Sequence, residues 1–287
     1  MKPLALINFS GGLGEGLALN AAIISISAKY NLEYFITNID YWIRTNQSGA
    51  HTPATKNTYG WLELFKNHEK FNFLTLFEDA YVQNFHNSFV KKITISNGLC
   101  ENLDQEIDYN KINQFTGTNQ DTRFWFPYFG EIKKSLKLNY FNFDEDAVVI
   151  HVRRTDWVGA SWHFIDLCMT DYYKNAIKMA DSKKIIFVSD DIAWVKEWFE
   201  SFSNELVYDS VDFCDTAPIS AFEIMMNAKK LVISQSTFSR WAAYLNNNIV
   251  FYPELFYKNQ PTPDLRACKD TNKFHLDGKN WLCVKYI

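Results

Sequence analysis

The sequence predicts an α/β protein of two domains with a parallel sheet in its C-terminal domain. The chain has 287 residues, more than one hydrophobic core usually serves, which predicts two domains. Apolar residues make up 47% of the chain and aromatic residues 17%, enough to fill both cores. In the second half, short apolar runs typical of buried strands alternate with segments of helical periodicity, and this order predicts the parallel sheet.

The first elements form a β–turn–α unit. Residues 3–10, PLALINFS, are predicted to form a strand, residues 11–16, GGLGEG, a glycine-rich turn, and residues 17–30 an apolar helix. Residues 40–145 are rich in asparagine and aromatic side chains and are weakly periodic. We expect them to form loops and helices that elaborate the first domain.

A polar run, NYFNFDED at residues 139–146, predicts the linker between an N-terminal domain at 1–145 and a C-terminal domain at 146–287. Beyond it, strands and helices alternate in chain order, as in a parallel α/β domain. The predicted strands are 147–152, 183–191, 204–209, 229–236 and 248–253, and the predicted helices are 171–180, 192–202, 219–228 and 237–246.

Charge and cysteine content exclude several classes of function. The net charge is −4 and Lys and Arg are scattered along the chain, so no basic face is expected for nucleic acid and any anion site must be local. The five cysteines are odd in number and widely spaced, and they lack CxxC or Cys/His ligand spacing. This pattern predicts reduced thiols inside a cell, and neither a disulfide framework nor a zinc site.

Hydropathy predicts a cytoplasmic protein. No run of about 18 uncharged apolar residues occurs, as a transmembrane helix would need. The apolar run at the N-terminus is too short for a signal peptide. We therefore expect no transmembrane segment, and leave open a peripheral membrane contact through some of the tryptophan and phenylalanine side chains.

Polar side chains follow three predicted strands, at the edge where a parallel α/β sheet binds its ligands. They lie in residues 151–156, 189–191 and 234–239. The first of these, HVRRTD, brings two arginines out of a buried strand, and unpaired charge beside a core is unfavourable. Strand alternation places Arg153 on the ligand side, and Arg154 on the other side with a carboxylate partner.

The stretch SQSTFSR, residues 234–240, places hydroxyls and backbone N–H groups at the start of a helix, where the helix dipole favours an anion. Together with Arg153 it predicts a diphosphate site. Ser236 and Thr237 are also typical helix N-caps, and this alternative stays open. The charge of a diphosphate must be neutralised by a divalent ion or by fixed cations and N–H groups; the sequence indicates the second.

Two acidic runs and the glycine-rich turn offer competing interpretations. Asp144–Asp146 is similar to a DxD metal motif but precedes its strand, which favours a solvated turn. Asp190 and Asp191 follow a strand, where capping of the next helix competes with ligand binding. The dinucleotide pattern GxGxxG fails because Leu17 occupies its last position, and the Walker A lysine is missing.

Four blocks of the chain resemble glycosyltransferase family 11, the α-1,2-fucosyltransferases, in order and spacing: GGLGEG, HVRRTD, FVSDD and EIMMNAKKLVISQSTFSRWAAYLN. That family typically shows GGLGNQMFQYA, HxRRxD, FSDD and NSTFSWWGAWL. The resemblance implies a GT-B fold of two Rossmann-like domains facing a cleft, with GDP-fucose held by the C-terminal domain. It also implies inversion at the anomeric carbon, and no required metal or other cofactor.

The resemblance further implies roles for individual residues. Arg153 is expected to bind the β-phosphate and to be catalytic, and His151 and Glu223 are expected to contact the guanosine. The other residues expected at the donor are Gly12, Gly14, Arg154, Asp190, Ser236, Thr237 and Ser239.

The chain departs from the family pattern in the first block, where Glu15 and Gly16 stand in place of Asn-Gln. A carboxylate between two glycines is similar to the corresponding loop of some protein O-fucosyltransferases and predicts Glu15 as the general base. A solvated turn carboxylate is the alternative, and Asp156 is the next candidate base. A second departure is Arg240-Trp241, where the family has Trp-Trp.

The predicted function is an inverting, metal-independent transfer of fucose from GDP-fucose to a hydroxyl of a glycan acceptor, α-1,2 to a galactoside. Two alternatives stay open. HVRRTD followed by STFSR also resembles the α-1,6- and protein O-fucosyltransferases. The altered motifs also fit a catalytically inactive nucleotide-sugar binding protein.

Overall fold

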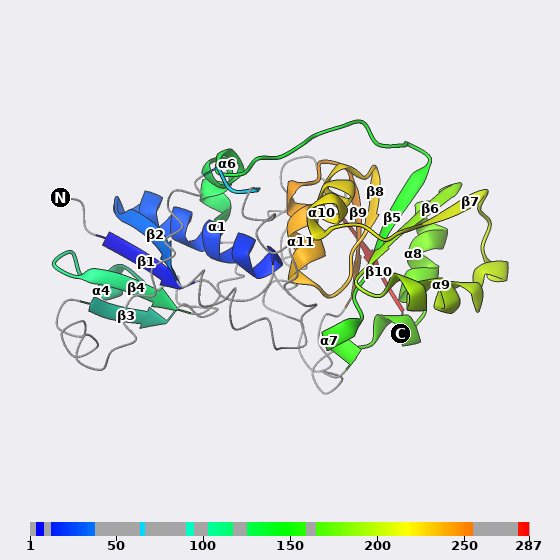
Figure 1. The fold of residues 1–287 in the computed structure, drawn as a ribbon, viewed down its shortest axis with the longest axis horizontal. Coiled ribbons are helices and arrows are strands. Elements are labelled where there is room, and N and C mark those ends of the chain that lie inside the picture. The colour runs from blue at the N-terminus through cyan, green and yellow to red at the C-terminus, as the bar shows by residue number, and fades with distance from the viewer. Residues whose placement is uncertain are drawn as a thin grey trace. The chain divides into compact units, whose positions relative to one another are not determined.

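Two parallel sheets organise the chain, one in each of two units, residues 1–137 and residues 138–287 (Figure 1). The fold is therefore α/β, as predicted. The computed structural model describes residues 4–8, 13–37, 64–66, 90–94, 103–116, 125–158, 165–254 and 281–286.

The first unit contains a four-stranded sheet in the order β2-β1-β4-β3, and every neighbouring pair is parallel. Its strands are β1 (Leu4–Asn8), β2 (Glu33–Thr37), β3 (Val90–Thr94) and β4 (Ile112–Thr116). Helix α1 (Leu13–Tyr30) connects β1 to β2 in a βαβ unit. From Leu13 to Ile26 every residue of α1 except Glu15 is buried, because the helix is apolar on all sides.

A polar contact fixes α1 within this unit. The side-chain amide of Asn20, which is fully buried, donates to the hydroxyl of Ser135 at 3.0 Å. Ser135 follows helix α6 (Phe129–Lys134) and its hydroxyl donates in turn to the carbonyl of Ile132. The other short elements here are the helix α4 (Leu103–Glu106) and the 3₁₀ helix η4 (Phe126–Tyr128).

Two predictions for the first unit are wrong. Helix α1 begins at Leu13, so Gly14 and Glu15 lie in its first turn and not in a glycine-rich turn. A glutamate in the first turn is stabilised by the helix dipole, which favours this earlier start. Residues 40–145, expected as loops and helices, contain strands β3 and β4. Their sequences, VKKIT and INQFT, interleave polar residues over only five positions, too few to show a strand pattern.

The second unit contains a six-stranded parallel sheet in the order β10-β9-β8-β5-β6-β7. Its strands are β5 (Ala147–Val152), β6 (Lys184–Ser189), β7 (Ser210–Cys214), β8 (Lys230–Val232), β9 (Ile249–Pro253) and β10 (Trp281–Val284). Its helices are α7 (Thr155–Val158), α8 (Tyr172–Ala180), α9 (Ile192–Glu200), α10 (Pro218–Asn227) and α11 (Thr237–Leu245).

Helices cover both faces of this sheet (Figure 1). The residues of β5 that face α8 and α9 belong to one large core cluster with Tyr172, Tyr173 and Phe199. Helices α10 and α11 lie on the other side, where His151 of β5 meets Phe238 of α11. Every residue of β5 is buried, as expected for a central strand covered on both faces.

Two tyrosines of α8 fix the backbone near the carboxyl ends of the strands. The Tyr172 hydroxyl donates to the carbonyls of Ile233 (2.6 Å) and Phe251 (3.2 Å), and the Tyr173 hydroxyl donates to the carbonyl of His151 (3.1 Å). Both tyrosines are fully or almost fully buried. Hydrogen bonds from these two side chains of α8 therefore hold the backbone at the edge of the sheet where the candidate site lies.

The predicted strand at 204–209 is wrong. The 3₁₀ helix η6 (Ser203–Glu205) occupies its first part, and β7 begins only at Ser210. Val207, which gave the segment its apolar character, is 97% exposed. The true strand is a half-exposed edge in which Val211 and Phe213 pack against the core and alternate with exposed polar residues. Strand β10 was not predicted.

The polar run 139–146 packs on the second unit. The side-chain amide of Asn227 on α10 donates to the carbonyl of Asn139 at 2.9 Å, and its oxygen accepts from the Phe141 N–H at 3.0 Å. The division between the units lies at Lys137, ahead of this run, whereas the sequence placed it at residue 145. The run ends in a turn before β5, where the Asp146 N–H donates to the carboxylate of Asp144.

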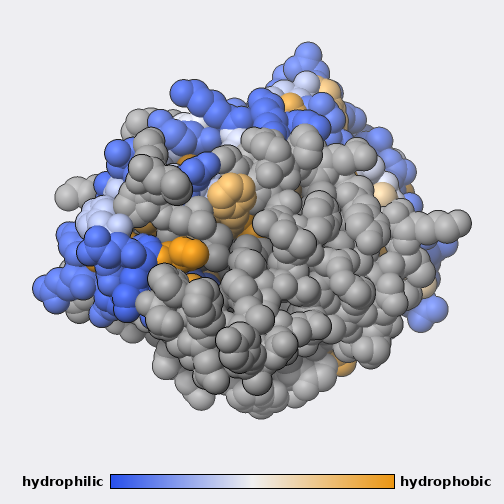
Figure 2. Space-filling view, turned by 60° about the vertical axis from the view of Figure 1, so that its left-hand side comes forward, coloured by the Kyte–Doolittle hydropathy of each residue, from blue (hydrophilic) through white to orange (hydrophobic). Residues whose placement is uncertain are grey.

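No helix among the residues that the structure describes is long and apolar enough to cross a membrane. On the face shown in Figure 2 the described surface is mostly hydrophilic, and hydrophobic residues show as small separate patches. Scattered patches of this kind are ordinary on protein surfaces.

Candidate functional site

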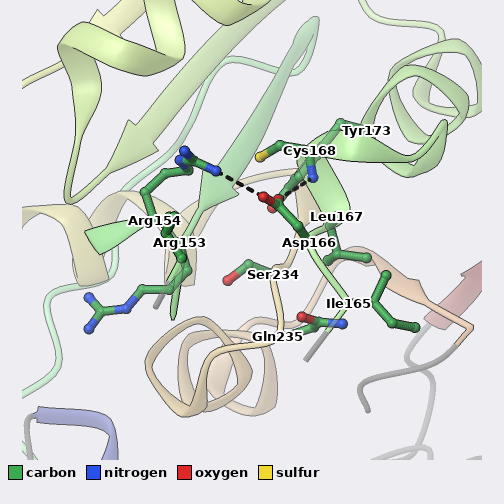
Figure 3. A pocket seen from close by; sticks show the side chains of 10 residues that line it. Arg153, Arg154, Ile165, Asp166, Leu167, Cys168, Tyr173, Ser234 and Gln235 are labelled. Atoms are coloured by element: carbon green, nitrogen blue, oxygen red, sulfur yellow. Dashed lines mark hydrogen bonds and ion pairs between the residues drawn. The ribbon is translucent and has the colours of Figure 1, made fainter. Parts of the chain in front are cut away.

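The candidate site lies at the carboxyl ends of the neighbouring strands β8, β5 and β6. A small pocket of about 50 Å³ opens there (Figure 3). It combines two guanidiniums, a carboxylate and polar groups of the loop after β8 with an apolar wall. Its lining residues are Arg153, Arg154, Val158, Ile165, Asp166, Leu167, Cys168, Tyr173, Ser234 and Gln235.

Arg153 is held by a carboxylate from the neighbouring strand. Its Nη1 lies 2.9 Å from Oδ2 of Asp190, which follows β6. The same carboxylate accepts the Arg154 backbone N–H at 2.8 Å and the Thr155 hydroxyl at 2.5 Å. Burial works to raise the pKa of Asp190, but the charge of Arg153 and these hydrogen bonds outweigh it, so the pKa lies below its usual value. Asp190 is therefore an anion at neutral pH.

Arg154 points to the other side of the chain, toward Asp166 (Figure 3). Its Nη1 lies 3.1 Å from Oδ2 of Asp166, and its guanidinium lies 3.5 Å from the ring centre of Trp194 in α9. Asp166 also accepts the N–H of Cys168 and so fixes the loop that forms the apolar wall. The predicted carboxylate partner of Arg154 is confirmed. Strand alternation is not the cause, because β5 ends at Val152.

His151 lies beneath the pocket and is only 3% exposed. Its Nδ1 is 2.8 Å from the hydroxyl of Ser234, and its ring packs on Phe238. Burial lowers the pKa of His151 to about 3, with the charge of Arg153 acting in the same direction and Asp190 against it. The ring is therefore neutral at physiological pH. In this position its ring contacts the Ser234 hydroxyl, and the contact with guanosine stays a prediction.

The start of α11 is built by serines that bond to the backbone. The Ser236 hydroxyl accepts from the Phe238 N–H at 3.3 Å, so the N-cap interpretation is confirmed for this residue. Ser239 is fully buried and its hydroxyl lies 3.4 Å from the Ser234 carbonyl and 3.3 Å from the Ser236 carbonyl. Its side chain therefore bonds to the backbone at the start of the helix, and its contact with a phosphate stays a prediction. Thr237 begins the helix and is half-buried.

Glu223 takes part in the contact between α10 and the polar run before β5. Its Oε1 accepts from the side-chain amide of Asn139 at 2.5 Å. Its carbonyl accepts from Asn227. A ligand that used Glu223 would share the carboxylate with Asn139.

The remaining predicted residues lie elsewhere or outside the described residues. Gly14 is buried in α1 of the first unit, and Glu15 is half-buried in the first turn of the same helix. Gly12 is outside the residues that the structure describes. Asp156 belongs to α7, but its side chain is likewise outside that description.

Acidic groups that sequence offered as metal ligands have other partners. Asp144 forms the turn before β5, at the amino end of the strand and away from the pocket. Asp191 caps α9 by accepting the Trp194 N–H at 3.3 Å. Within the described ranges, no group of three or more His, Cys, Asp or Glu residues has an arrangement that holds a metal ion.

The contacts of Asp166 and Trp194 with Arg154 were not predicted from the sequence. Asp166 lies outside every predicted helix and strand. Its only sequence signal is that aspartate is a common N-cap residue, the position that it occupies before Leu167. Trp194 lay within a predicted amphipathic helix, where an aromatic side chain normally indicates core packing. Cys168 was also unassigned. Burial and the nearby Asp166 raise the pKa of its thiol well above the usual value, so it is a neutral wall residue and not a nucleophile.

The sequence of the chain matches a known protein family. A protein-family model described as "Glycosyl transferase family 11" matches residues 129–282, more than half of the chain. The chain belongs to glycosyl transferase family 11. The match covers the second unit almost entirely, and with it the strand ends that carry Arg153, Asp190 and the start of α11.

Two curated relatives come from Escherichia coli. The chain is 30% identical over 117 residues to "O-antigen biosynthesis glycosyltransferase WbnK", a match that spans 38% of either protein. It is 27% identical over 214 residues to an "Alpha-1,2-colitosyltransferase", covering 65% of this chain and 70% of that protein. The chain thus spans little more than a third of the first relative and about two thirds of the second.

Among solved structures, the fucosyltransferase NodZ from Bradyrhizobium is similar in fold. With 11% sequence identity, the match covers 86% of this chain and 93% of NodZ, at a TM-score of 0.50. At this identity the likeness concerns the fold alone. It agrees with the α/β, GT-B-like class predicted from the sequence.

Proposed function

We propose that this member of family 11 transfers fucose from GDP-fucose to a hydroxyl of a glycan acceptor, with inversion and without a metal ion. The observation that carries the proposal is the position of Arg153, a guanidinium anchored at the carboxyl end of the central strand, beside the loop that leads into α11. A diphosphate placed there meets a fixed cation and the N–H groups of a helix start.

The reaction needs little more from this unit than charge. The acceptor oxygen forms a bond to the anomeric carbon while the bond between that carbon and the β-phosphate oxygen breaks, and the electron pair leaves with GDP. Arg153 stabilises the charge that develops on the β-phosphate. Glu15, proposed as general base, takes the proton of the attacking hydroxyl. Arg154 keeps the loop after β5 in place through Asp166 and Trp194.

The α-1,2 linkage to a galactoside is part of this proposal, supported by the family and by a relative whose name gives an α-1,2 linkage. That same relative favours a second candidate sugar, colitose, for which a nucleotide-activated donor would occupy the same site. We also propose the cytoplasm as the place of the reaction. Among the described residues, the free thiols at Cys168 and Cys214 are compatible with a reducing compartment.

A nucleotide screen by thermal unfolding tests the proposal. A ligand that binds only the folded state stabilises it by about 2.7 kcal/mol at a hundred times its dissociation constant. We expect stabilisation by GDP and by GDP-fucose, and none by UDP or NAD at equal concentration. Stabilisation by UDP or NAD in place of GDP would contradict the donor assignment. Product analysis with fucose and colitose donors then decides the sugar.

A further inference from the structure

The carboxylate of Asp190 accepts from three donors, all of which belong to residues 153–155. Its carboxylate meets Nη1 of Arg153 at 2.9 Å, the backbone N–H of Arg154 at 2.8 Å and the hydroxyl of Thr155 at 2.5 Å. Oδ1 accepts the backbone N–H, and Oδ2 serves both side chains. The side chain of Asp190 is 15% exposed and that of Arg153 25%, so the pair is largely withdrawn from solvent.

The strand register causes this juxtaposition. Strands β5 and β6 are parallel, and Val152 pairs with Ser189 as the last pair of the ladder. The next residue on each strand is Arg153 on one side and Asp190 on the other, so the two emerge together. The neighbouring Asp191 turns away to cap α9. The two adjacent carboxylates therefore have separate partners.

We propose that Asp190 is a positioning residue, which acts on the reaction only by holding the Arg153 guanidinium at the β-phosphate. This inference rests on the proposed function. The sequence assigned Asp190 to the donor site as a direct contact, whereas both of its oxygens are engaged by the residues that follow β5. A carboxylate that itself touched the diphosphate would repel it.

The physical role follows from the length of the arginine side chain. An unanchored arginine samples many rotamers, and ordering it when the donor binds has an entropic cost of the order of its side-chain freedom. A charge-assisted contact made before the donor arrives removes that cost and fixes the direction of the guanidinium. Displacement of a positioning group by about 1 Å is known to lower rates by as much as about 100-fold. The ordering cost of one side chain has a small effect on binding, whereas misplacement of the guanidinium in the transition state lowers turnover.

Asp190→Asn tests the role against a matched control, Asp191→Asn. Both replace one carboxylate of the same dipeptide by its amide, and asparagine at 191 still caps α9. We expect Asp190→Asn to lower kcat about tenfold or more while the dissociation constant of GDP changes less than about threefold. Asp191→Asn should leave kcat within about twofold. Tighter GDP binding with unchanged kcat in Asp190→Asn would show that the carboxylate competes with the phosphate, and would overturn the proposal.

A double-mutant cycle separates positioning from a general structural effect. If Asp190 acts through Arg153, then adding Asp190→Asn to an Arg153→Lys enzyme should change kcat by less than about threefold, because the guanidinium that it holds is gone. An equal loss in both backgrounds would overturn the proposal. If Asp190→Asn does not fold, Asp190→Glu keeps the charge but displaces the guanidinium; it should melt near the wild-type temperature with lowered kcat, and full activity would count against the role.

These outcomes are distinct from failure of the proposed function. A wild-type protein that binds no GDP and transfers no sugar contradicts the function itself, and with it the role of Asp190. A wild-type protein that binds and transfers, together with an unaffected Asp190→Asn variant, contradicts the role of Asp190 alone.

Discussion

Arg153 and Arg154 leave the same strand side by side and enter different surroundings. Arg153 is one of the residues that line the pocket and is held from the end of β6 by Asp190; its guanidinium points away from Asp166 (Figure 3). Arg154 lies flat on Trp194 and bonds to Asp166, with only 11% of its side chain exposed. The difference teaches that two identical side chains at one strand end can have different roles: Arg154 fixes the loops around the pocket, and Arg153 is the arginine that we propose for the ligand.

The largest expected effect comes from Arg153→Lys, which removes the guanidinium that we propose contacts the diphosphate. Lysine keeps the charge but loses the planar fork that contacts a phosphate through two N–H groups. We expect a loss of about 2 to 4 kcal/mol in transition-state stabilisation, measured as kcat/KM of the purified variant, with unfolding unchanged. Arg154→Lys is the control, for which the melting temperature should fall while kcat stays within about threefold. Near-wild-type turnover of Arg153→Lys would remove this residue from the mechanism.

A second prediction concerns the general base, because neither arginine can accept the proton of the attacking hydroxyl. Glu15→Gln preserves the shape of the first turn of α1 and removes basicity. We expect turnover to fall about 100-fold, or about 2.7 kcal/mol, with an unchanged dissociation constant of GDP. Turnover measured from pH 5 to 8 checks this. A glutamine variant that works at the normal rate across that range would leave Glu15 as a helix residue alone, with Asp156 next to be tested.

The buried side chain of His151 predicts that the stability of the protein depends on pH. The pKa of His151 is about 3 in the folded protein and about 6.5 in an unfolded chain. Between these values the unfolded state binds a proton that the folded state does not, so this stabilising contribution is complete above pH 6.5 and is lost as pH falls toward 3. The slope is at most about 1.4 kcal/mol per pH unit.

Urea unfolding of the wild type and His151→Gln at pH 7.5, 5.5 and 4.5 measures this contribution. The difference between the two unfolding free energies reports chiefly on His151, because Asp190, whose pKa is lowered and which interacts with His151, stays ionised in the folded protein over this pH range. We expect that difference to shrink as pH falls. Parallel pH curves would mean that the histidine is already solvated, or charged, in the folded protein.

The smallest expected effect is that of removing metal ions. If Arg153 and the start of α11 neutralise the diphosphate, millimolar EDTA should change the transfer rate by less than about twofold, or about 0.5 kcal/mol. The rate after chelation and after addition of Mn²⁺ is the measurement. Complete inhibition that Mn²⁺ reverses would show that a divalent metal ion neutralises the diphosphate. It would contradict the role proposed for Arg153.

The second unit was easier to predict than the first, for a physical reason. Strand β5 is buried throughout and flanked by helices with clear periodicity, so AVVIHV and its neighbours stand out in the sequence. Strands β3 and β4, VKKIT and INQFT, each have two adjacent polar residues that interrupt the alternation, and the edge strand β7 is half-exposed. Such strands are formed by pairing with a neighbour, which the local sequence does not record.

The candidate site was predicted in composition but not in its internal pairing. The order of strands in the chain placed Arg153, Asp190 and Ser234 at one edge, since carboxyl ends of parallel strands share an edge. That Asp190 binds Arg153 follows from the register of β5 on β6, which only the structure gives. The inward direction of Ser239 likewise depends on how α11 packs. A serine motif at a helix start has the same sequence whether its hydroxyls face the ligand or the core.

The central claim is that Arg153 meets the β-phosphate and Arg154 does not. Calorimetric titration of GDP and GMP into the wild type, Arg153→Lys and Arg154→Lys tests it most directly, because the two nucleotides differ only by that phosphate. We predict that the wild type prefers GDP, that Arg153→Lys reduces the preference by about tenfold or about 1.4 kcal/mol, and that Arg154→Lys retains it within about threefold. An unchanged preference in Arg153→Lys, or a lost preference in Arg154→Lys, would contradict the account.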